Sequence, residues 1–518
     1  FSGVNPAQDK GNRGLQLVLE LACILVILVA LINFANFALA ESPMRIKGVN
    51  TRKVLGQSLL SIRTGLIVEC VVTALIAAAL STLLIYIAGP YLMSANLVRG
   101  SLLIPENWIL WGSIWLIAIA VGIVAGLYPA FYATSLPTDL ALKGSFGLSP
   151  SGMKLRRVLV CVQLVISMIM VTYIGILMLQ SRYIFRSDYG YDKDAIVIGR
   201  LNNIAQKDAI RTELLGISGI EDVAFAQNTI GTSDEYMNWG RGDGEKSVTF
   251  GVVVIDHHYF NTMGIKIIEG RDFNAYDGDC YIVNKAMRDR YNWIEVNKKL
   301  NDNDYPVIGI CENIRFYTTR RGSATEPCAF FVYGPEYEDW GDPCSTIHIR
   351  IGENVDKFEV RRQCEKIIQG FSGNNSVSLS FLDESLEWTY IDEFRFISQI
   401  EIFSLICVFI TLIGVFCLTM FETEYRRKEI GIRKVLGSSA GEIISLFSRS
   451  YILLIALSFV IAAPVAWYLG NEWLQNFAER TPIHFWLFPL SLLIVAFIVL
   501  GTVVIQSWRV ANANPVES

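Results

Sequence analysis

Charged residues are scarce in this chain of 518 amino acids. They make up 18% of the sequence, compared with about 25% in an ordinary soluble protein, whereas hydrophobic residues make up 52%. This composition excludes a single water-soluble globule. The formal net charge of −5 leaves no basic excess, so we expect no nucleic-acid partner.

Sequence motifs of catalytic and nucleotide-binding sites are missing as well. The chain has no Gly-x-x-x-x-Gly-Lys-Ser/Thr string, whose backbone amides and lysine would cradle nucleotide phosphates. It also lacks Gly-x-Ser-x-Gly, His-Glu-x-x-His and Cys-x-x-Cys, which mark hydrolases, zinc enzymes and redox proteins. We therefore expect that the chain is not an enzyme, has no catalytic residue and binds no cofactor itself.

Histidine is rare, and the four His residues give little support for a metal site. His257 and His258 are adjacent and follow Asp256 at the expected start of a helix. Neighbouring side chains on a helix point about 100° apart, which is a poor geometry for binding one ion. We expect no metal site.

The few charges in the chain are unevenly distributed. Residues 181–400 carry 24 Lys or Arg and 35 Asp or Glu, and the other 298 residues carry only 34 charged side chains. This pattern predicts one water-exposed domain between two membrane-embedded blocks.

Seven apolar stretches are long enough to cross a membrane. A helix needs about 20 mostly apolar residues to span roughly 30 Å of hydrocarbon. The stretches that meet this requirement are Leu15–Ala40, Thr64–Gly89, Trp108–Thr134, Val158–Leu179, Ile397–Phe421, Tyr451–Gly470 and Phe485–Gln506.

The basic residues between these stretches predict their orientation, because Lys and Arg gather in cytoplasmic connections. If the N-terminal end lies outside, 16 of the 20 Lys and Arg residues beyond 181–400 lie on the cytoplasmic side, and residues 181–400 lie outside the cytoplasm. The four exceptions are Lys10, Arg13, Arg99 and Arg480. The 16 are Arg45, Lys47, Arg52, Lys53, Arg63, Lys143, Lys154, Arg156, Arg157, Arg426, Arg427, Lys428, Arg433, Lys434, Arg449 and Arg509.

Two parts of the chain repeat each other at an offset of 381 residues. The repeat includes the string Arg-Lys-Val-Leu-Gly, at Arg52–Gly56 and Arg433–Gly437, and near the third span the offset slips by three. Most matches are polar, so coincidence among apolar residues does not explain them. We infer a duplicated three-span module. Other matched pairs are Glu20 and Glu401, Glu41 and Glu422, Arg45 and Arg426, Lys47 and Lys428, Ser58 and Ser439, Gly89 and Gly470, and Pro137 and Pro515.

The second copy is preceded by a span and an exterior domain, whereas the first copy begins close to Phe1. We therefore expect that a longer protein has one more span and one more exterior domain before Phe1. On this expectation residues 1–14 are the end of that earlier domain.

The basic loop of each copy is expected to form a short amphipathic helix. In the second copy, Ile430, Val435 and Leu436 would share one side of the helix, and Gly437 would end it. One interpretation is plain topology with contact to anionic lipids. The same Arg-Lys-Val-Leu-Gly string in both copies favours the other interpretation, docking of a two-fold partner.

The residues of these loops resemble a known family. The string Arg426–Gly437, which follows a span, resembles the coupling-helix signature of MacB/FtsX-type ABC transporter permeases, and Ser42–Gly56 is similar to the first-module version in double-module members. Ala511–Pro515 is similar to the ends of these modules. In the exterior region, Tyr259–Phe273 and Val307–Phe316 look like the family's extracytoplasmic domain.

The resemblance implies a fold and a division of the chain. The fold is an α-helical membrane protein with an α+β extracytoplasmic domain and a duplicated FtsX-like transmembrane module. The expected domains are 1–14, the end of an earlier exterior domain; 15–150, the first module; 151–184, the fourth span and stalk; 185–390, a MacB-like periplasmic core domain; and 391–518, the second module.

The resemblance also implies a function. The chain would be the permease subunit of an ATP-driven mechanotransmitting transporter in the bacterial inner membrane, which exports peptides, lipoproteins or small toxic compounds. A dimer of ABC ATPase subunits, which binds the ATP and Mg²⁺, would dock on the coupling helices, and a periplasmic adaptor or an outer-membrane conduit would be a further partner. The alternative is an FtsX-like regulator that moves an extracytoplasmic hydrolase or sensor and transports no cargo.

Ten residues are expected to contact the ATPases. One of them, Glu429, is replaced by Gly48 in the first copy, so the two copies are not expected to dock equally. The ten are Arg45, Lys47, Arg52, Lys53, Arg426, Arg427, Lys428, Glu429, Arg433 and Lys434.

Two long helices are expected to carry motion to the exterior domain. Met153–Arg186 would be about 51 Å long, and a helix from near Ser385 to Phe421 about 55 Å. The exterior domain between them alternates strand-like and helical runs. The strand-like runs are Ala195–Gly199, Val248–Ile255, Ile265–Ile268, Val307–Ile310, Thr346–Ile351 and Val377–Phe381, and the helical runs are Ala205–Leu215, Lys285–Arg290 and Asp356–Gln369.

Two further groups of residues have open interpretations. Glu20 and Glu401, near the outer ends of their spans, are expected to lie at the membrane interface or in a contact between the repeats rather than to couple protons. Five Cys in the exterior region face an oxidising compartment, where a disulfide is allowed, but their odd number leaves at least one unpaired. They are Cys280, Cys311, Cys328, Cys344 and Cys364.

Overall fold

The computed structural model describes most of the chain, with gaps. The described residues are 13–94, 107–135, 150–201, 206–233, 236–242, 246–301, 304–319, 325–372 and 377–512. The expectations for residues 1–12 and for Lys10, Pro137, Lys143 and Pro515 lie outside them.

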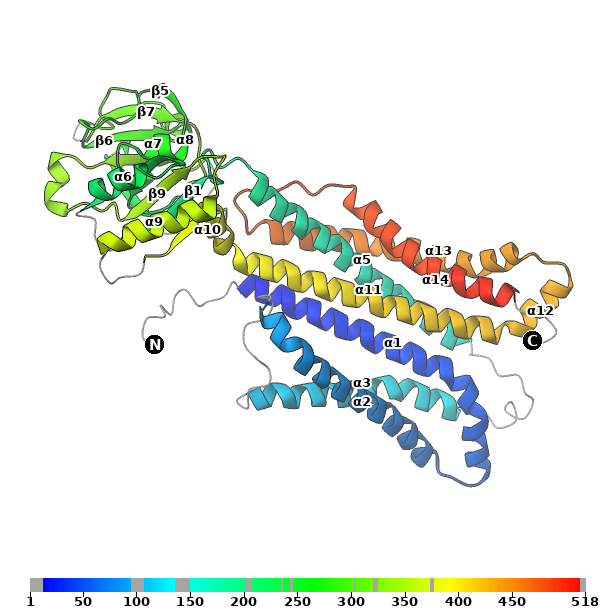
Figure 1. The fold of residues 1–518 in the computed structure, drawn as a ribbon. Helices are drawn as coiled ribbons and strands as arrows, with labels where there is room; N and C mark the ends of the chain where they lie inside the picture. Colours follow the sequence, from blue (N-terminus) through cyan, green and yellow to red (C-terminus); the bar gives the residue numbers. More distant parts are fainter. Residues whose placement is uncertain are drawn as a thin grey trace. The chain divides into compact units, whose positions relative to one another are not determined.

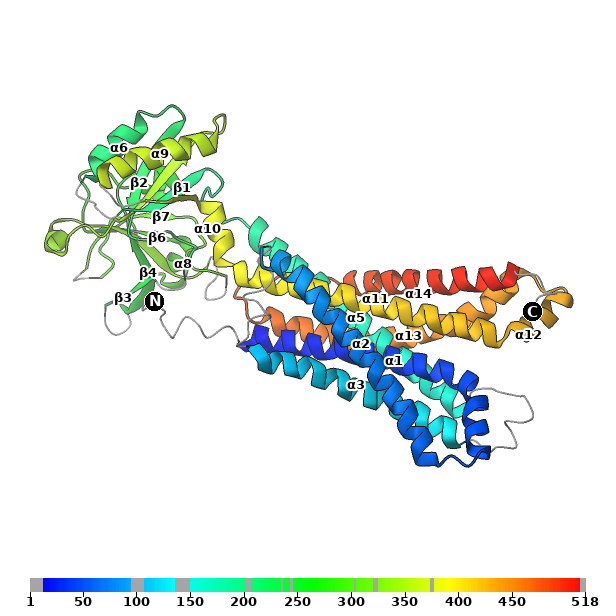
Figure 2. The same cartoon turned by 60° about the horizontal axis from the view of Figure 1, so that its bottom comes forward.

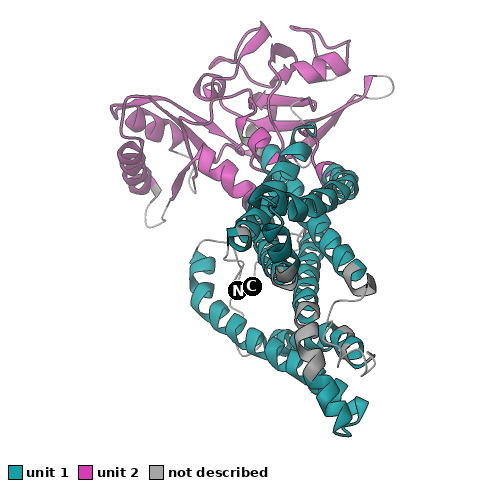
Figure 3. Ribbon diagram, turned by 90° about the vertical axis from the view of Figure 1, so that its right-hand side faces the viewer, with its two compact units in different colours: residues 1–179, 393–472, 482–518 teal, residues 180–392, 473–481 magenta. Residues whose placement is uncertain are grey.

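The chain forms two compact units, shown in teal and magenta in Figure 3. The first comprises residues 1–179, 393–472 and 482–518, which hold the apolar helices, and the second comprises residues 180–392 and 473–481. The second unit therefore includes a short segment from far along the chain, between two apolar helices.

Seven long apolar helices confirm the seven predicted spans. Each is long and apolar enough to cross a membrane, and they are drawn in Figure 1. Their bounds are α1 (Arg13–Val54), α2 (Leu59–Ser94), α3 (Trp108–Ser135), α5 (Pro150–Arg186), α11 (Ile391–Tyr425), α13 (Ala440–Leu474) and α14 (Leu487–Asn512), with the short helix α12 (Arg427–Val435) between α11 and α13.

Helix α5 packs against the helices of the second copy. Hydroxyl groups join it to its neighbours inside the apolar unit: Ser167 Oγ lies 2.7 Å from Thr411 Oγ1 of α11, and Thr172 Oγ1 donates to Ser491 Oγ of α14 at 2.8 Å. Such hydrogen bonds between small polar side chains hold membrane helices together where the hydrophobic effect does not. In the first copy, α3 packs on both α1 and α2 (Figure 2).

The two copies meet at equivalent positions of α1 and α11. Asn33 and Gly414 are 381 residues apart, and Asn33 Nδ2 donates to the Ile410 carbonyl at 3.4 Å. A Cβ atom on Gly414 would lie 2.4 Å from Asn33 Oδ1, so a larger residue there would force the Asn33 side chain to move. The acids near the outer ends are both exposed, and Glu20 Oε1 accepts a hydrogen bond from Gln16 at 3.0 Å.

The exterior unit contains two β-sheets. The first has the order β10-β1-β9-β2 with antiparallel pairs, and the second has the order β3-β4-β8-β6-β7-β5, in which β4 with β8 and β6 with β7 are parallel. The strands are β1 (Ile196–Arg200), β2 (Ile220–Ala226), β3 (Met237–Arg241), β4 (Val248–Val254), β5 (Ile267–Gly270), β6 (Cys280–Asn284), β7 (Val307–Cys311), β8 (Cys328–Val332), β9 (Thr346–Ile351) and β10 (Leu379–Phe381).

Helices α6 and α9 cover one face of the first sheet. The alternation of β9 explains this: Ile347 and Ile349 point into the core beneath these helices, whereas His348 faces the ring of Tyr259 at 5.1 Å on the other side. The predicted strand-like runs Thr346–Ile351 and Val377–Phe381 and the helical run Asp356–Gln369 between them correspond to β9, β10 and α9. The remaining elements are α6 (Lys207–Leu215), α7 (Tyr259–Met263), α8 (Lys285–Arg290), α9 (Lys357–Ser372), α10 (Leu382–Thr389) and the 3₁₀ helix at Pro335–Trp340.

The helix expected from near Ser385 to Phe421 is interrupted, and that prediction was wrong. Helix α10 ends at Thr389, Tyr390 is not helical, and α11 begins at Ile391. The Tyr390 ring is buried, and its hydroxyl oxygen accepts a hydrogen bond from the Thr319 amide at 3.0 Å. Anchoring this side chain in the exterior unit ends one helix before the next begins. By contrast, α5 is helical throughout Met153–Arg186, as predicted.

The five exterior cysteines are all free and buried. Burial raises the pKa of the thiols of Cys280, Cys311 and Cys364 to about 12, compared with about 8.5 for an unperturbed thiol. They therefore behave as small apolar core residues, and no structural disulfide holds the described part of this unit together.

These thiols give a direct test of the exterior core. We predict that a membrane-impermeant maleimide leaves all five unlabelled in the native protein, and that raising the pH to 9 does not speed the reaction, because the thiols stay protonated. Denaturant should expose all five. Labelling of native protein at the rate of an exposed thiol, or an intact mass lower by two hydrogens, would contradict this arrangement.

Candidate functional site: the two coupling helices

The basic loop of the second copy forms the predicted short helix. Helix α11 ends at Tyr425, α12 begins at Arg427 after a turn at Arg426, and Gly437 ends it with a φ of +94°. The Gly437 amide donates to the Lys434 carbonyl and the Ser438 amide to the Arg433 carbonyl, at 3.1 and 2.9 Å. This is a glycine-terminated helix end, for which a left-handed residue is required.

The first copy ends its basic segment in the same way. Gly56 has a φ of +86°, its amide donates to the Lys53 carbonyl at 3.0 Å, and the Gln57 amide donates to the Arg52 carbonyl at 3.0 Å. The two copies differ at the other end, since α1 runs into this segment without a break. The repeated sequence thus encodes the same helix end but a different junction with the preceding span.

A serine begins the next span in each copy. Ser58 Oγ accepts a hydrogen bond from the Ser61 amide, and Ser439 Oγ accepts one from the Glu442 amide, both at 3.3 Å. The Glu442 carboxylate in turn accepts a hydrogen bond from the Ser439 amide at 3.2 Å, which completes a capping box. Helix end and helix start are therefore fixed within a few residues of each other in both copies.

An apolar contact seats each coupling segment on the following span. In the first copy Val49 packs with Ile62, and in the second Ile430 packs in a core that includes Ile443. Each pair is related by the offset of 381 residues, and all four side chains are at most 4% exposed. The segments are thus held to their spans as well as joined to them.

Two apolar residues at the tip of each segment are exposed to solvent. The exposed fractions are 73% and 80% for Val54 and Leu55, and 77% and 80% for Val435 and Leu436. The prediction that Val435 and Leu436 share the buried side with Ile430 was therefore wrong. Five and six residues at about 100° each turn them away from Ile430. The ten residues predicted to contact the ATPases do not include these four apolar residues, although they belong to the repeated string.

The charged residues predicted to contact a partner have several environments. Arg426 lies 3.4 Å from Glu422, and its guanidinium lies 5.8 Å from the centre of the Phe447 ring. Lys53 Nζ donates to the Thr134 carbonyl of α3 at 2.6 Å. Arg52, Glu429 and Arg433 are exposed and Lys434 is half-buried, while Arg45, Lys47, Arg427 and Lys428 lie in helices with side chains outside the described residues.

The substitution of Gly48 for Glu429 has a structural consequence. Glu429 accepts a hydrogen bond from Arg433 one turn further on, at 2.7 Å, whereas glycine cannot hold the equivalent Arg52 in this way. A Cβ atom on Gly48 would meet nothing within 4 Å. The difference therefore lies in the charge pattern offered to a partner and in helix stability, about 1 kcal/mol for an interior glycine, rather than in packing.

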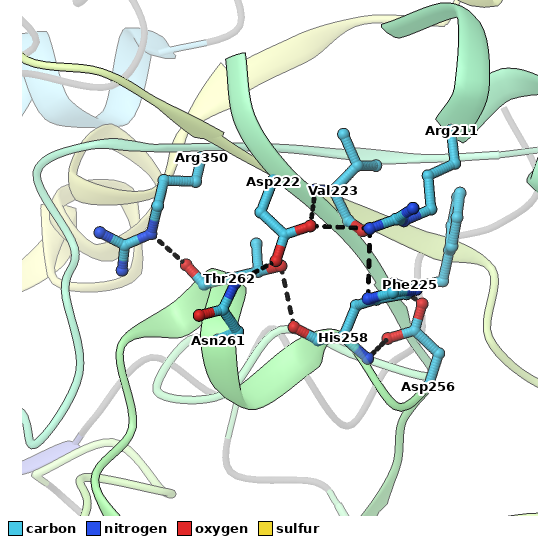
Figure 4. Close-up of polar contacts among 9 residues, drawn as sticks. All are labelled: Arg211, Asp222, Val223, Phe225, Asp256, His258, Asn261, Thr262 and Arg350. Atoms are coloured by element: carbon cyan, nitrogen blue, oxygen red, sulfur yellow. Dashed lines mark hydrogen bonds and ion pairs between the residues drawn. The ribbon is translucent and has the colours of Figure 1, made fainter. Parts of the chain in front are cut away.

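Polar residues of the exterior unit form a structural network, not a metal site (Figure 4). Asp222 Oδ1 pairs with Arg211 at 2.9 Å, its Oδ2 accepts from Asn261 at 2.6 Å, and Arg211 Nη2 lies 3.2 Å from His258 Nδ1. Asp256 accepts the His258 amide at 3.1 Å. No group of three His, Cys, Asp or Glu within the described ranges could hold a metal ion.

Comparisons with known proteins agree with the duplication. The family model described as FtsX-like permease C-terminal matches residues 21–138 and again residues 401–515. The comparison with curated proteins gave no match.

Solved structures match part of the chain. The periplasmic region of MacB from Actinobacillus actinomycetemcomitans is 14% identical, with 39% of this chain and 94% of that chain covered and a TM-score of 0.29. The extracellular domain of the noncanonic ABC-type transporter YknZ from Gram-positive bacteria is 10% identical, covering 36% and 99% with a TM-score of 0.27. A domain of a putative permease protein from Porphyromonas gingivalis is 12% identical, covering 36% and 91% with a TM-score of 0.26.

The opposite exposures of Ile430 and Leu436 lead to a prediction about stability. Ile430→Ala should destabilise the seating of α12 by about 2–5 kcal/mol, because it leaves a cavity against α13, whereas Leu436→Ala should have almost no effect. Amide hydrogen exchange of residues 427–437 measures the difference. Equal protection in the two variants would contradict the assignment of buried and exposed sides.

Proposed function

Because the chain belongs to the FtsX-like permease family of ABC-type transporters, we propose that it is the membrane subunit of an ATP-driven mechanotransmitting system in a bacterial inner membrane. It is a multi-pass membrane protein with a periplasmic or extracellular domain. The exterior domain, residues 185–390 in our division of the chain, would deliver the motion to a peptide, lipoprotein or small toxic compound.

The observation that carries this proposal is the pair of equivalent coupling segments. Each presents an exposed Val-Leu tip beside exposed basic residues and is seated on its span by a buried aliphatic contact. A dimer of ABC ATPases has two equal surfaces, so two docking segments of equivalent sequence and structure fit it. Apolar tips that insert into pockets would supply most of the binding energy, and the basic residues would orient the encounter.

The helices that connect the membrane to the exterior domain support a mechanical role. Helix α5 has 37 residues and α11 has 35, which gives about 55 and 52 Å at 1.5 Å per residue. Both exceed the roughly 30 Å hydrocarbon core. Rigid helices of this length can carry a displacement made at the cytoplasmic side to the other side of the membrane.

The tips should be essential for activation of the ATPase. We predict that Val435→Asp with Leu436→Asp abolishes permease-stimulated ATP hydrolysis in nanodiscs and weakens ATPase binding about tenfold or more, because charges replace apolar contacts. Val54→Asp with Leu55→Asp tests the first copy. Arg449→Glu, on an exposed residue of α13, is the control.

Charge reversal at Arg426, Arg427 and Lys428 examines the basic face in the same assay, and membrane insertion should stay normal throughout. Full stimulation by the doubly substituted tip would refute docking at these helices.

Copurification distinguishes two uses of the motion. Copurification with an adaptor or outer-membrane conduit supports transport, and copurification with a hydrolase or sensor kinase supports the regulator.

The lever role predicts a separate effect of proline. Arg182→Pro in α5 and Gln399→Pro in α11 should each cost about 3 kcal/mol of helix stability and introduce a kink, leaving ATPase docking intact. Position 394 is less informative, because it is the fourth residue of α11 and proline is tolerated better near the start of a helix than in its interior.

Spin labels on the exterior domain would measure the outcome. The ATP-dependent change in distance should collapse in both proline variants, while Arg182→Ala and Gln399→Ala keep it. A change that survives both proline substitutions would exclude the levers and favour a pathway through the spans.

A further inference from the structure

Three segments of the exterior unit lead directly into apolar helices. They are the end of α5, the Tyr390 turn before α11, and residues 473–481 between α13 and α14. A single stretch after β7, Arg315–Thr319, contacts all three. The contacts described below all lie within this one compact unit.

Arg315 is the centre of these contacts. Its side chain is only 2% exposed. Nη1 donates to the Ile184 carbonyl in the last turn of α5 at 3.0 Å, Nη2 pairs with the carboxylate of Glu479, and the guanidinium lies 4.7 Å from the centre of the Tyr189 ring. One side chain therefore joins the end of α5 to the α13–α14 connection.

Backbone and amide hydrogen bonds reinforce the same connection. Gln180 of α5 donates through Nε2 to the Glu479 carbonyl at 2.9 Å and accepts from the Thr481 amide at 2.8 Å. The Ala478 amide donates to the Thr319 carbonyl at 2.9 Å. Thr319 in turn donates its own amide to the hydroxyl oxygen of Tyr390. Hydrogen bonds at Ala478 and Thr481 therefore hold the connection on both sides of Glu479.

The two buried charges at this position need each other as partners, whereas apolar side chains would need none. A buried ion pair often contributes less to stability than well-packed apolar side chains, but it fixes geometry, and loss of one partner leaves the other charge uncompensated. Burial acts to lower the pKa of Arg315, but the Glu479 carboxylate more than offsets this, and the pKa is raised. Nε of Arg315 is buried and has no hydrogen-bond partner among the described residues, and the other two guanidinium nitrogens contact Ile184 and Glu479.

We propose that Arg315 and Glu479 form a third mechanical link, through which the α13–α14 connection moves the exterior domain together with α5 and α11. This inference rests on the proposed function, because it assumes that ATP drives such motion. Arg315 and Glu479 are positioning residues in this role. They fix residues 473–481 to the domain, so that a displacement of α13 and α14 is delivered to the domain rather than absorbed in the connection.

Glu479→Gln tests the link, because it removes the charge and keeps the size of the side chain. We expect normal docking and ATP hydrolysis but a several-fold smaller ATP-dependent change in the distance between spin labels at Tyr276, which is fully exposed, and at Glu472 on α13. The ratio of displacement to hydrolysis is the readout, because loss of stability alone does not change it selectively.

Two controls are matched to this variant. Arg480→Gln removes a charge from the exposed neighbour on the same connection. Asp222→Asn weakens the ion pair of Arg211 with Asp222, which also lies in the exterior unit but does not involve residues 473–481. Both should keep the full displacement.

A double variant, Arg315→Met with Glu479→Leu, replaces the pair by apolar side chains and guards against misfolding of Glu479→Gln. It should fold and still lose the displacement. If the unmodified protein shows no ATP-dependent change, the proposed function fails. If it does, and Glu479→Gln or the folded double variant keeps the full change, the link is wrong while the proposed function stands.

Discussion

The need to satisfy every backbone amide and carbonyl inside hydrocarbon is the constraint on which this structure depends. A membrane segment meets that need by being a continuous helix, and a continuous helix is also stiff. In α5 the helix continues to Arg186 and ends beside Arg315 of the exterior unit. In the proposed function, the same hydrogen bonding that permits insertion would also make the helix a rod that transmits displacement. The exterior unit needs only rigid attachments to use it.

The duplication gives the two copies equivalent structural elements. Val49 and Ile62 in the first copy repeat the contact of Ile430 and Ile443 in the second, and the glycines that end the two segments share a left-handed backbone. Asn33 and Gly414, also equivalent, touch each other where α1 meets α11. The two copies thus present matched elements. They differ where α1 runs on unbroken and where Gly48 replaces Glu429.

The parts of the fold that could be predicted depend on local pattern. Long apolar runs, basic connections and the repeated Arg-Lys-Val-Leu-Gly string identified the spans, their number and both coupling segments. Strands β2, β3, β6 and β8 were not predicted, and β6 and β8 are short, fully buried runs without alternation. The break at Tyr390 was missed because its cause is a hydrogen bond to Thr319, 71 residues away. Arg315 and Glu479 are 164 residues apart, and no motif connects them. The exposure of Val435 and Leu436 could have been predicted from sequence, because their angle around the helix axis relative to Ile430 determines it.

The central claim is that both coupling segments contact an ATPase at once. Hydrogen–deuterium exchange of the permease in nanodiscs, alone and with the ATPase that copurifies with it, tests this most directly. The account predicts new protection at residues 48–56 and at residues 427–437, stronger in the second segment, which has the Glu429–Arg433 pair. Protection confined to other cytoplasmic connections, with both segments unchanged, would contradict it.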